Sequence, residues 1–273
     1  MNTAHLIDIG VNLCHESLRK DLTGVLERAR AAGVTHMILT GTNAPQSETA
    51  LALARQTGFH STAGFHPHHA SEFDASGLAL LRELASAREV VAIGECGLDF
   101  NRDFSPRPAQ ERAFEQQLEL AAELRLPVFL HQRDAHARFV AILRAYRDHL
   151  VDAVAHCFTG DRGELRAYRD LDLHVGITGW VCDERRGQAL REAVNDVPDE
   201  RLMLETDAPF LMPRTIRPRP KRNVNEPAYL PWVLQEVARL RGQEPDTVAR
   251  MSTRNARRFF RLPDADTALQ ARP

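Results

Sequence analysis

Short apolar runs with the character of β-strands alternate with helix-length segments along almost the whole chain of 273 residues. The eight runs begin at His5, His36, His60, Val90, Pro127, Asp152, His174 and Leu202. Each run is followed by enough residues for a helix, and this alternation is typical of parallel β/α units. The order of the runs therefore predicts an α/β protein built on a parallel sheet.

One of the intervening segments, "PAQERAFEQQLELAAEL", shows the helical pattern clearly. Phe114, Leu118, Ala121 and Ala122 recur at positions i, i+4, i+7 and i+8, so they share one face of a helix. A proline stands near the start of the segment and another follows its end, as is usual at helix boundaries. We expect an amphipathic helix here.

Two architectures fit eight parallel units, a closed barrel and an open doubly wound sheet. Eight units in 273 residues match the usual size of a (β/α)8 barrel. No GxGxxG sequence follows the first run, so the nucleotide-binding form of the open sheet loses its main support. No linker or change of composition divides the chain. We therefore predict a single-domain (β/α)8 TIM barrel over residues 1–262 and a loose tail over residues 263–273.

The composition is that of an ordinary globular protein and limits the partners of the chain. The net charge is −2, so any affinity for nucleic acid must come from local patches of positive charge. The first twenty residues hold no apolar signal core, and no apolar run approaches the roughly 18 residues of a membrane helix. The four cysteines form no CxxC pair and are interpreted as reduced thiols. We predict a cytoplasmic monomer without a membrane partner or an obligatory protein partner.

Titratable residues stand at the ends of several runs, or just after them. They are Asp8, His66, His68, Glu95, His131, His156, Glu205 and Asp207. Each residue alone is most simply a hydrogen-bonded structural group or a helix cap. In a parallel barrel, however, the carboxyl ends of the strands and the loops that follow them build the active site. The set as a whole therefore predicts one shared polar site.

Imidazoles and carboxylates together are the usual ligands of the divalent metals that assist hydrolysis. Glu95, His131 and His156 supply two imidazoles and one carboxylate, which is enough to hold a cation with open positions. Asp207 and Asp8 are candidates for completing its coordination or for holding a second ion. The pattern predicts a divalent metal ion as cofactor.

Glu205 and Asp207 lie two residues apart in "LMLETDAPF", so alternation along a strand turns them to the same face. Asp207 lies at the tip of the strand and is the better candidate for activating water. Glu205 is either a catalytic residue or a structural one, paired with an arginine or lysine below the site.

A basic, proline-rich segment, "PRTIRPRPKRNVNEP", follows the last run and is expected to form an exposed loop. Because the last loops of such barrels often bind phosphate, Arg217, Arg219 and Lys221 are candidates for binding a polyanionic substrate. The alternative is a solvated charged loop without a partner. Trp180, after the seventh run, is suited either to stacking on a base or to packing under a helix.

Several motifs resemble those of the TatD family of metal-dependent deoxyribonucleases. They are "IDIGVNL", "GFHPH", "AIGECGLDF", "HQRDAH", "HCFTG", "GITGWVCDERRG" and "ETDAPFL", in this order from about residue 7 to residue 230. The resemblance implies a barrel of the metallo-dependent hydrolase type that cleaves phosphodiester bonds. It also implies that Glu95, His131 and His156 bind metal, that Asp207 is the catalytic aspartate, and that His66 lines the same site.

One departure from the family pattern concerns the first strand. Many relatives carry D-x-H-x-H there, with two histidines that bind a second metal, whereas this chain has Asp8, Gly10 and Asn12 at the corresponding places. An amide oxygen binds a hard, oxygen-preferring ion far more weakly than an imidazole binds zinc. We therefore expect the second metal site to be weaker and to suit Mg²⁺ better than Zn²⁺. The expected cofactor is Mg²⁺, with Mn²⁺ and Zn²⁺ as alternatives.

The resemblance implies a 3′-5′ exonuclease that acts on single-stranded DNA, with RNA as a further substrate, in DNA repair or nucleic-acid turnover. His66 or His68 would contact the phosphate or protonate the leaving oxygen, and Arg133 would help to bind the strand. Two other classes remain open. One is a metal-dependent hydrolase of an amide or aminoacyl ester, and the other is a non-catalytic binding barrel.

Overall fold

The structure is a computed structural model that describes residues 5–263. Its eight strands form one sheet in the order β1 to β8, and every neighbouring pair is parallel. The strands are β1 (Leu6–Val11), β2 (Val34–Leu39), β3 (His60–Ala63), β4 (Val90–Asp99), β5 (Val128–Arg133), β6 (Ala153–Ala155), β7 (His174–Ile177) and β8 (Leu202–Leu204). Each strand overlaps one of the eight predicted runs. The predicted (β/α)8 barrel is confirmed.

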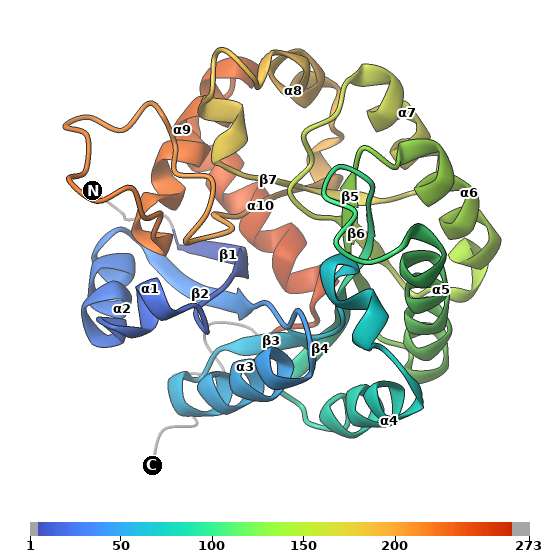
Figure 1. Ribbon diagram of the computed structural model, residues 1–273. Coiled ribbons are helices and arrows are strands. Elements are labelled where there is room, and N and C mark those ends of the chain that lie inside the picture. The colour runs from blue at the N-terminus through green and yellow to red at the C-terminus, as the bar shows by residue number, and fades with distance from the viewer. Residues whose placement is uncertain (1–4, 264–273) are drawn as a thin grey trace.

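Helices surround the strands on the outside of the barrel (Figure 1). The longer ones are α2 (Leu22–Ala31), α3 (Ala44–Thr57), α4 (Ala75–Leu84), α5 (Arg107–Leu124), α6 (His136–Tyr146), α7 (Arg162–Asp170), α9 (Leu230–Arg241) and α10 (Pro245–Phe259). Two short helices are α1 (Glu16–Arg19) and α8 (Gln188–Ala193). A continuous hydrophobic layer lies between these helices and the outer face of the sheet.

Helix α5 shows how the sequence pattern produces this layer. Phe114, Leu118 and Ala121 are buried against the sheet and Ala122 is partly buried, as the helical spacing predicts. The helix ends at Arg125, whose backbone takes the left-handed conformation with φ of 53°. Its buried Gln117 also positions a loop of the site, because the side chain accepts a hydrogen bond from the Phe65 N–H and donates one to the Phe65 carbonyl oxygen.

The first and last strands meet only near their carboxyl ends. Val11 and Ala208 form an isolated parallel bridge, and the Asn12 N–H donates to the Ala208 carbonyl oxygen at 2.8 Å. The Asp207 N–H donates to the Gly10 carbonyl oxygen at 2.9 Å. This closure fixes the position of Asp207 beside β1.

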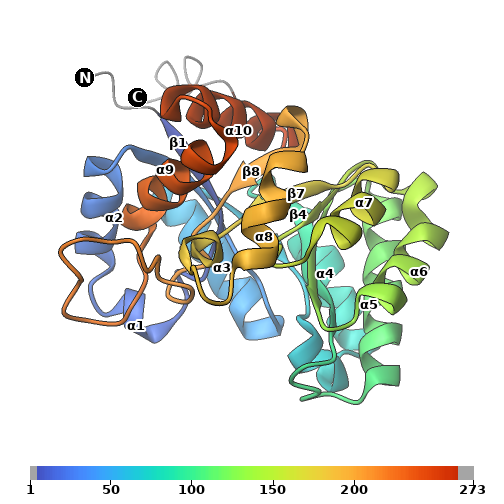
Figure 2. The same ribbon diagram turned by 90° about the horizontal axis from the view of Figure 1, so that it is seen from above.

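The amino ends of the strands, which we call the foot, are covered by α10 (Figure 2). The Asn255 side chain of this helix donates to the carbonyl oxygens of Asp199 and Leu202, just before and at the start of β8. Phe259 and Phe260 join the apolar residues that fill the barrel interior, such as Phe129. The carboxyl ends and their loops, which we call the mouth, carry the polar residues.

Within residues 5–263 no helix is both long and apolar enough to cross a membrane. Of the loose tail predicted for residues 263–273, all but residue 263 lies outside the described residues.

Candidate metal centre

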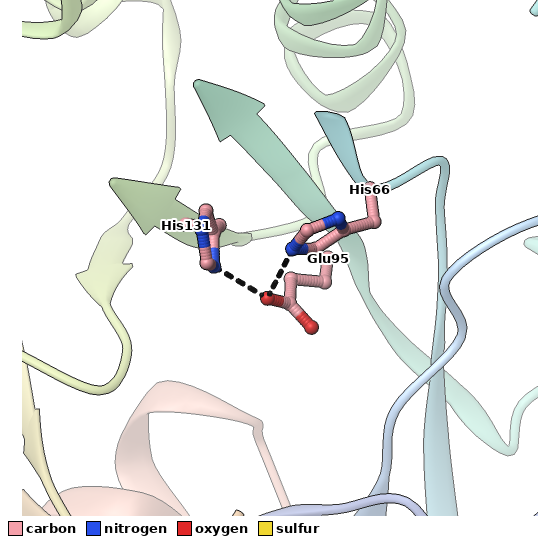
Figure 3. A group of neighbouring side chains, drawn as sticks. All are labelled: His66, Glu95 and His131. Carbon is pink, nitrogen blue, oxygen red and sulfur yellow. Dashed lines mark hydrogen bonds and ion pairs between the residues drawn. The ribbon is translucent and has the colours of Figure 1, made fainter. Parts of the chain in front are cut away.

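Glu95 lies in the second half of β4, at the mouth, and is only 5% exposed. One of its oxygens, Oε1, is surrounded by imidazole nitrogens from three different segments. His131 Nδ1 on β5 lies 2.8 Å away, and His156 Nε2, just after β6, lies 2.9 Å away. His66 Nε2, in the loop after β3, lies 3.4 Å away (Figure 3). Three of the five residues predicted to bind metal, Glu95, His131 and His156, therefore meet at one carboxylate oxygen.

The protonation behaviour of these groups follows from burial and from their neighbours. Burial alone would raise the pKa of Glu95, but His156, His66 and the hydrogen bond with His131 outweigh it and hold the pKa well below its ordinary value. Burial would lower the pKa of His156, but the carboxylates of Glu95 and Glu205 raise it well above the ordinary value. His66 lacks comparable compensation, and burial together with repulsion from His131 lowers its pKa.

A divalent cation fits this cluster. His66, Glu95 and His131 each offer one ligand atom, and the three atoms lie within 4.8 Å of one another. His131 Nε2 is buried and has no hydrogen-bond partner among the described residues. A buried imidazole nitrogen left without a partner is costly unless something else occupies it. The donor set, a carboxylate with several imidazoles, is the set that zinc and other divalent ions use in hydrolases.

Asp207 follows β8 directly and takes a left-handed backbone conformation with φ of 54°. Its Oδ1 accepts a hydrogen bond from the side-chain amide of Asn12 at 2.9 Å. Burial raises the pKa of Asp207 to about 7; Glu95 and Glu205 also raise it, while His156 and Asn12 act in the opposite direction. The neutral amide of the first strand thus orients the predicted catalytic aspartate.

Glu205 has no exposed surface, and its partners are not the arginine or lysine of the structural alternative. Oε2 lies 3.2 Å from His156 Nδ1, and Oε1 accepts a hydrogen bond from the Cys157 N–H. A Cβ atom at Gly10 would lie 2.4 Å from Oε2, and one at Gly176 would lie 2.5 Å from Oε1. Because Gly10 and Gly176 have no side chain, the Glu205 carboxylate has room to lie beside His156 and hold its ring.

Asp8 is fully buried beside the closure of the barrel. Its oxygens accept hydrogen bonds from the Thr206 N–H at 2.9 Å, the Thr206 hydroxyl at 2.6 Å and the Gly10 N–H at 3.3 Å. Burial raises the pKa of Asp8 to about 8 despite these bonds. The structure thus gives Asp8 a role in joining β1 to β8, and its role as a metal ligand stays a prediction.

Asp99, at the end of β4, was not among the predicted site residues. Its Oδ2 lies 2.7 Å from Nε2 of His68, so Asp99 orients this predicted substrate-binding residue. The same oxygen lies 3.8 Å from Nε2 of His131, which is predicted to bind metal. The sequence contains a signal for it, because Glu95 and Asp99 are four residues apart on one strand and alternation gives them the same face.

A groove of about 1060 Å³ adjoins the mouth between the loops after β7 and β8. Arg133, Arg217 and Arg219 line it, as the prediction of a basic substrate-binding surface requires. Lys221 lies elsewhere and lines a separate hollow of about 420 Å³ with Arg28. Of the three predicted loop residues, Lys221 is therefore the one that does not face this groove.

A parallel barrel whose mouth gathers imidazoles and carboxylates around one oxygen defines the class of metal-assisted barrel hydrolases. The family model described as TatD related DNase matches residues 7–261. The chain therefore belongs to the TatD-related DNase family, and the resemblance of its motifs is confirmed.

Individual relatives agree with this assignment. A protein of Erwinia billingiae named 3′-5′ ssDNA/RNA exonuclease TatD is 55% identical over 260 residues, which cover 94% of this chain and 100% of that protein. A protein of the same name from Salmonella typhimurium is 51% identical over 258 residues, 94% of this chain and 99% of its own. Among solved structures, the TatD homologue YjjV of Escherichia coli K12 superposes with a TM-score of 0.87 at 28% identity, covering 96% and 100% of the two chains.

Proposed function

We propose that the protein is a Mg²⁺-dependent 3′-5′ exonuclease that removes nucleotides from single-stranded DNA and RNA. The observation that carries the proposal is the meeting of three imidazoles at Glu95 Oε1 beside a groove lined with arginines. The names of relatives more than 50% identical over nearly the whole chain support the same substrate and polarity.

Glu95, His131 and His156 would hold the metal, with His66 beside them. A divalent cation bound there lowers the pKa of a bound water and neutralises charge on the phosphoryl oxygens. Asp207 is held at the edge of this cluster by Asn12, and we assign it the proton of the attacking water. Glu205 fixes the ring of His156 through its second nitrogen, as the carboxylate partners of metal-binding histidines do.

His68 stands on the other side of the cluster, paired with Asp99 at 2.7 Å and close to the His66 ring. The contact with the Asp99 carboxylate fixes the orientation of the His68 ring, and an imidazole held in a defined orientation can contact a phosphate oxygen or exchange a proton with the leaving oxygen. We therefore assign His68 to the substrate phosphate or to the leaving group. Asp99 is then the positioning residue for this histidine.

Mg²⁺ is proposed because the first strand offers the oxygen of Asn12 where many relatives have an imidazole, and hard ions prefer oxygen ligands. A role in DNA repair or nucleic-acid turnover and a cytoplasmic location belong to the same proposal. The four cysteines are unpaired in the structure, as they would be in a reducing compartment.

End-labelled oligonucleotides test the proposal. Single strands labelled at the 5′ end should shorten stepwise in Mg²⁺, duplexes should be degraded more slowly, and chelation of the metal should stop the reaction. The ladder should be compared in Mg²⁺, Mn²⁺ and Zn²⁺. Cleavage of a covalently closed single-stranded circle would contradict an exonuclease, and the absence of any cleavage in all three ions would contradict a nuclease.

A further inference from the structure

The groove beside the mouth is a local concentration of positive charge on a chain of net charge −2. Seven arginines line it, against two carboxylates, Asp183 and Glu184. The exposed ring of Phe210, at 49%, and the ring of Trp180 line the same groove. Positive charge that follows a channel, interrupted by aromatic rings, is how proteins bind single-stranded nucleic acid without reading its sequence.

Asp183 holds two of the arginine side chains of this groove in place. It is only 2% exposed, and its Oδ2 binds Arg186 Nε at 2.8 Å and Arg214 Nε at 3.0 Å. Its Oδ1 accepts hydrogen bonds from the backbone N–H groups of Arg185 and Arg186. One carboxylate thus joins the loop after β7 to the loop after β8 and leaves two guanidinium groups with a fixed direction and a net positive charge.

Trp180 lines the groove and is partly buried, because it also packs against the hydrophobic layer of the barrel. The guanidinium carbon of Arg186 lies 4.5 Å from the centre of its ring, and that of Arg133 lies 5.8 Å away. Arg133 is two residues after His131 on β5, so alternation turns the two side chains to the same face. Arg133 therefore lies on β5 between the metal-binding His131 and the ring of Trp180, and its guanidinium is farther from that ring than the guanidinium of Arg186.

The charge of the groove indicates which part of a strand it binds. The nucleotide released from a 3′ end leaves with a single phosphate, whereas the remaining strand carries a phosphate at every linkage. A run of arginines therefore binds the remaining strand far more tightly than it binds the released nucleotide. The arginine groove is thus suited to the retained strand, on the 5′ side of the cleaved bond.

We propose that Trp180 is a stacking platform for one base on the 5′ side of the cleaved bond, with Arg133 and Arg186 binding the phosphates that flank this base. The inference rests on the proposed exonuclease function and adds a binding site to it. It explains how a barrel mouth selects single strands, because a base within a duplex cannot present its face to a ring.

Tryptophan fluorescence tests the binding step without catalysis. The chain has two tryptophans, Trp180 and Trp232, so replacing Trp232 in α9 by phenylalanine isolates the signal of Trp180. In this background, with the metal chelated, a single strand of thymidylates should quench the fluorescence to saturation. Strands with one abasic site at successive positions from the 3′ end should show one internal position at which affinity falls by about 10-fold.

Two variants identify the ring as the cause. Trp180→Leu keeps an apolar side chain without an aromatic face, and Trp180→Phe keeps the face. In cleavage assays with Mg²⁺ we expect the KM for the intact strand to rise about 10-fold in Trp180→Leu and to recover in Trp180→Phe. For the abasic strand, the KM should not rise further when Trp180 is replaced by leucine, because the missing base and the missing ring remove the same contact.

The outcomes separate the two proposals. An abasic penalty of equal size in the wild type and in Trp180→Leu, or no quenching of Trp180 by any strand, overturns the stacking site even if the enzyme cleaves normally. Position-dependent quenching by a protein that cleaves no strand in Mg²⁺, Mn²⁺ or Zn²⁺ supports the binding site and overturns the exonuclease. The quenching and the abasic series use the native Trp180 ring, so these two measurements remain decisive even if a Trp180 variant fails to fold.

Discussion

Histidines lie at both ends of this barrel, and the two ends use them in opposite ways. At the mouth, His131 and His156 face the carboxylate of Glu95. Neighbouring carboxylates outweigh burial and raise the pKa of both rings: Asp99 and Glu95 act on His131, and Glu95 and Glu205 act on His156. At the foot, His36 Nε2 lies 2.9 Å from His60 Nδ1. Burial lowers the pKa of His36 to about 3, and the neighbouring His60 acts in the same direction; burial also lowers the pKa of His60.

The contrast shows that residue type alone does not identify a site in such a fold. Imidazoles near the start of a strand lie at the foot, which in barrels of this kind serves stability. Imidazoles at the end of a strand, or just beyond it, meet the carboxylates of neighbouring strands. If this division is correct, changes at the mouth should affect catalysis and changes at the foot should affect folding.

The largest expected effect is at the mouth. Glu95→Gln keeps the shape of the side chain but removes the charge that three imidazoles share, so we expect hydrolysis of single strands to fall by about 10³-fold or more. The circular dichroism spectrum should not change. Turnover close to that of the wild type would contradict the catalytic role of the mouth, because the central carboxylate would then be dispensable.

The reverse result is expected at the foot. Phe260 is 2% exposed and packs edge-on against Phe259, with ring centres 4.7 Å apart. Phe260→Ala should lower the free energy of unfolding by about 3–5 kcal/mol, the usual cost of removing a buried aromatic ring. Urea denaturation measures this loss. The kcat and KM of the folded protein should be unchanged, and a loss of kcat at full folding would contradict the division.

A smaller effect follows from the depressed pKa of His36. Between pH 6.5 and about 3, the unfolded chain binds a proton at this residue that the folded protein does not bind, so the folded state loses stability as the pH falls below 6.5. His36→Phe should reduce the loss between pH 7 and pH 5 by about 1–2 kcal/mol. Denaturation curves at several pH values will show it, and parallel pH profiles for both proteins would exclude it.

The smallest effect concerns the salt dependence of substrate binding. Arg219 lines the groove, whereas Arg88 is a fully solvated arginine beside the start of β4 at the foot. Arg219→Gln should lower the slope of log affinity against log salt by about 0.7, the value for one contact to a phosphate of a single strand. The matched Arg88→Gln should leave the slope unchanged. Equal changes in both would mean that net charge, rather than the groove, attracts the strand.

Much of the architecture could be predicted because it depends on local patterns. Each strand carries its own apolar run, and each helix its own periodicity, so the barrel follows from counting units. Glu95, His131 and His156 could be found for the same reason, since each interrupts or ends an apolar run. Their meeting follows from the parallel order of the strands.

The contacts that the sequence did not reveal depend on register and on loop paths. Strict alternation would place Asp8 and Gly10 on one face of the sheet. The pairing of β1 with β2 is irregular between Asp8 and Val11, so alternation does not hold there. Asp8 consequently binds Thr206 across the closure of the barrel. Lys221 lies in the basic loop with Arg219, and only the course of that loop decides that they face different hollows.

Gly10 and Gly176 leave room for the buried carboxylate of Glu205, and this limits which residues the first strand can carry. A histidine introduced at Gly10, as in relatives with two histidines on the first strand, would place its Cβ where the buried Glu205 carboxylate now lies. The carboxylate would have to move, and its contact with His156 Nδ1 at 3.2 Å would move with it. The residue at position 10 therefore influences how Glu205 holds His156.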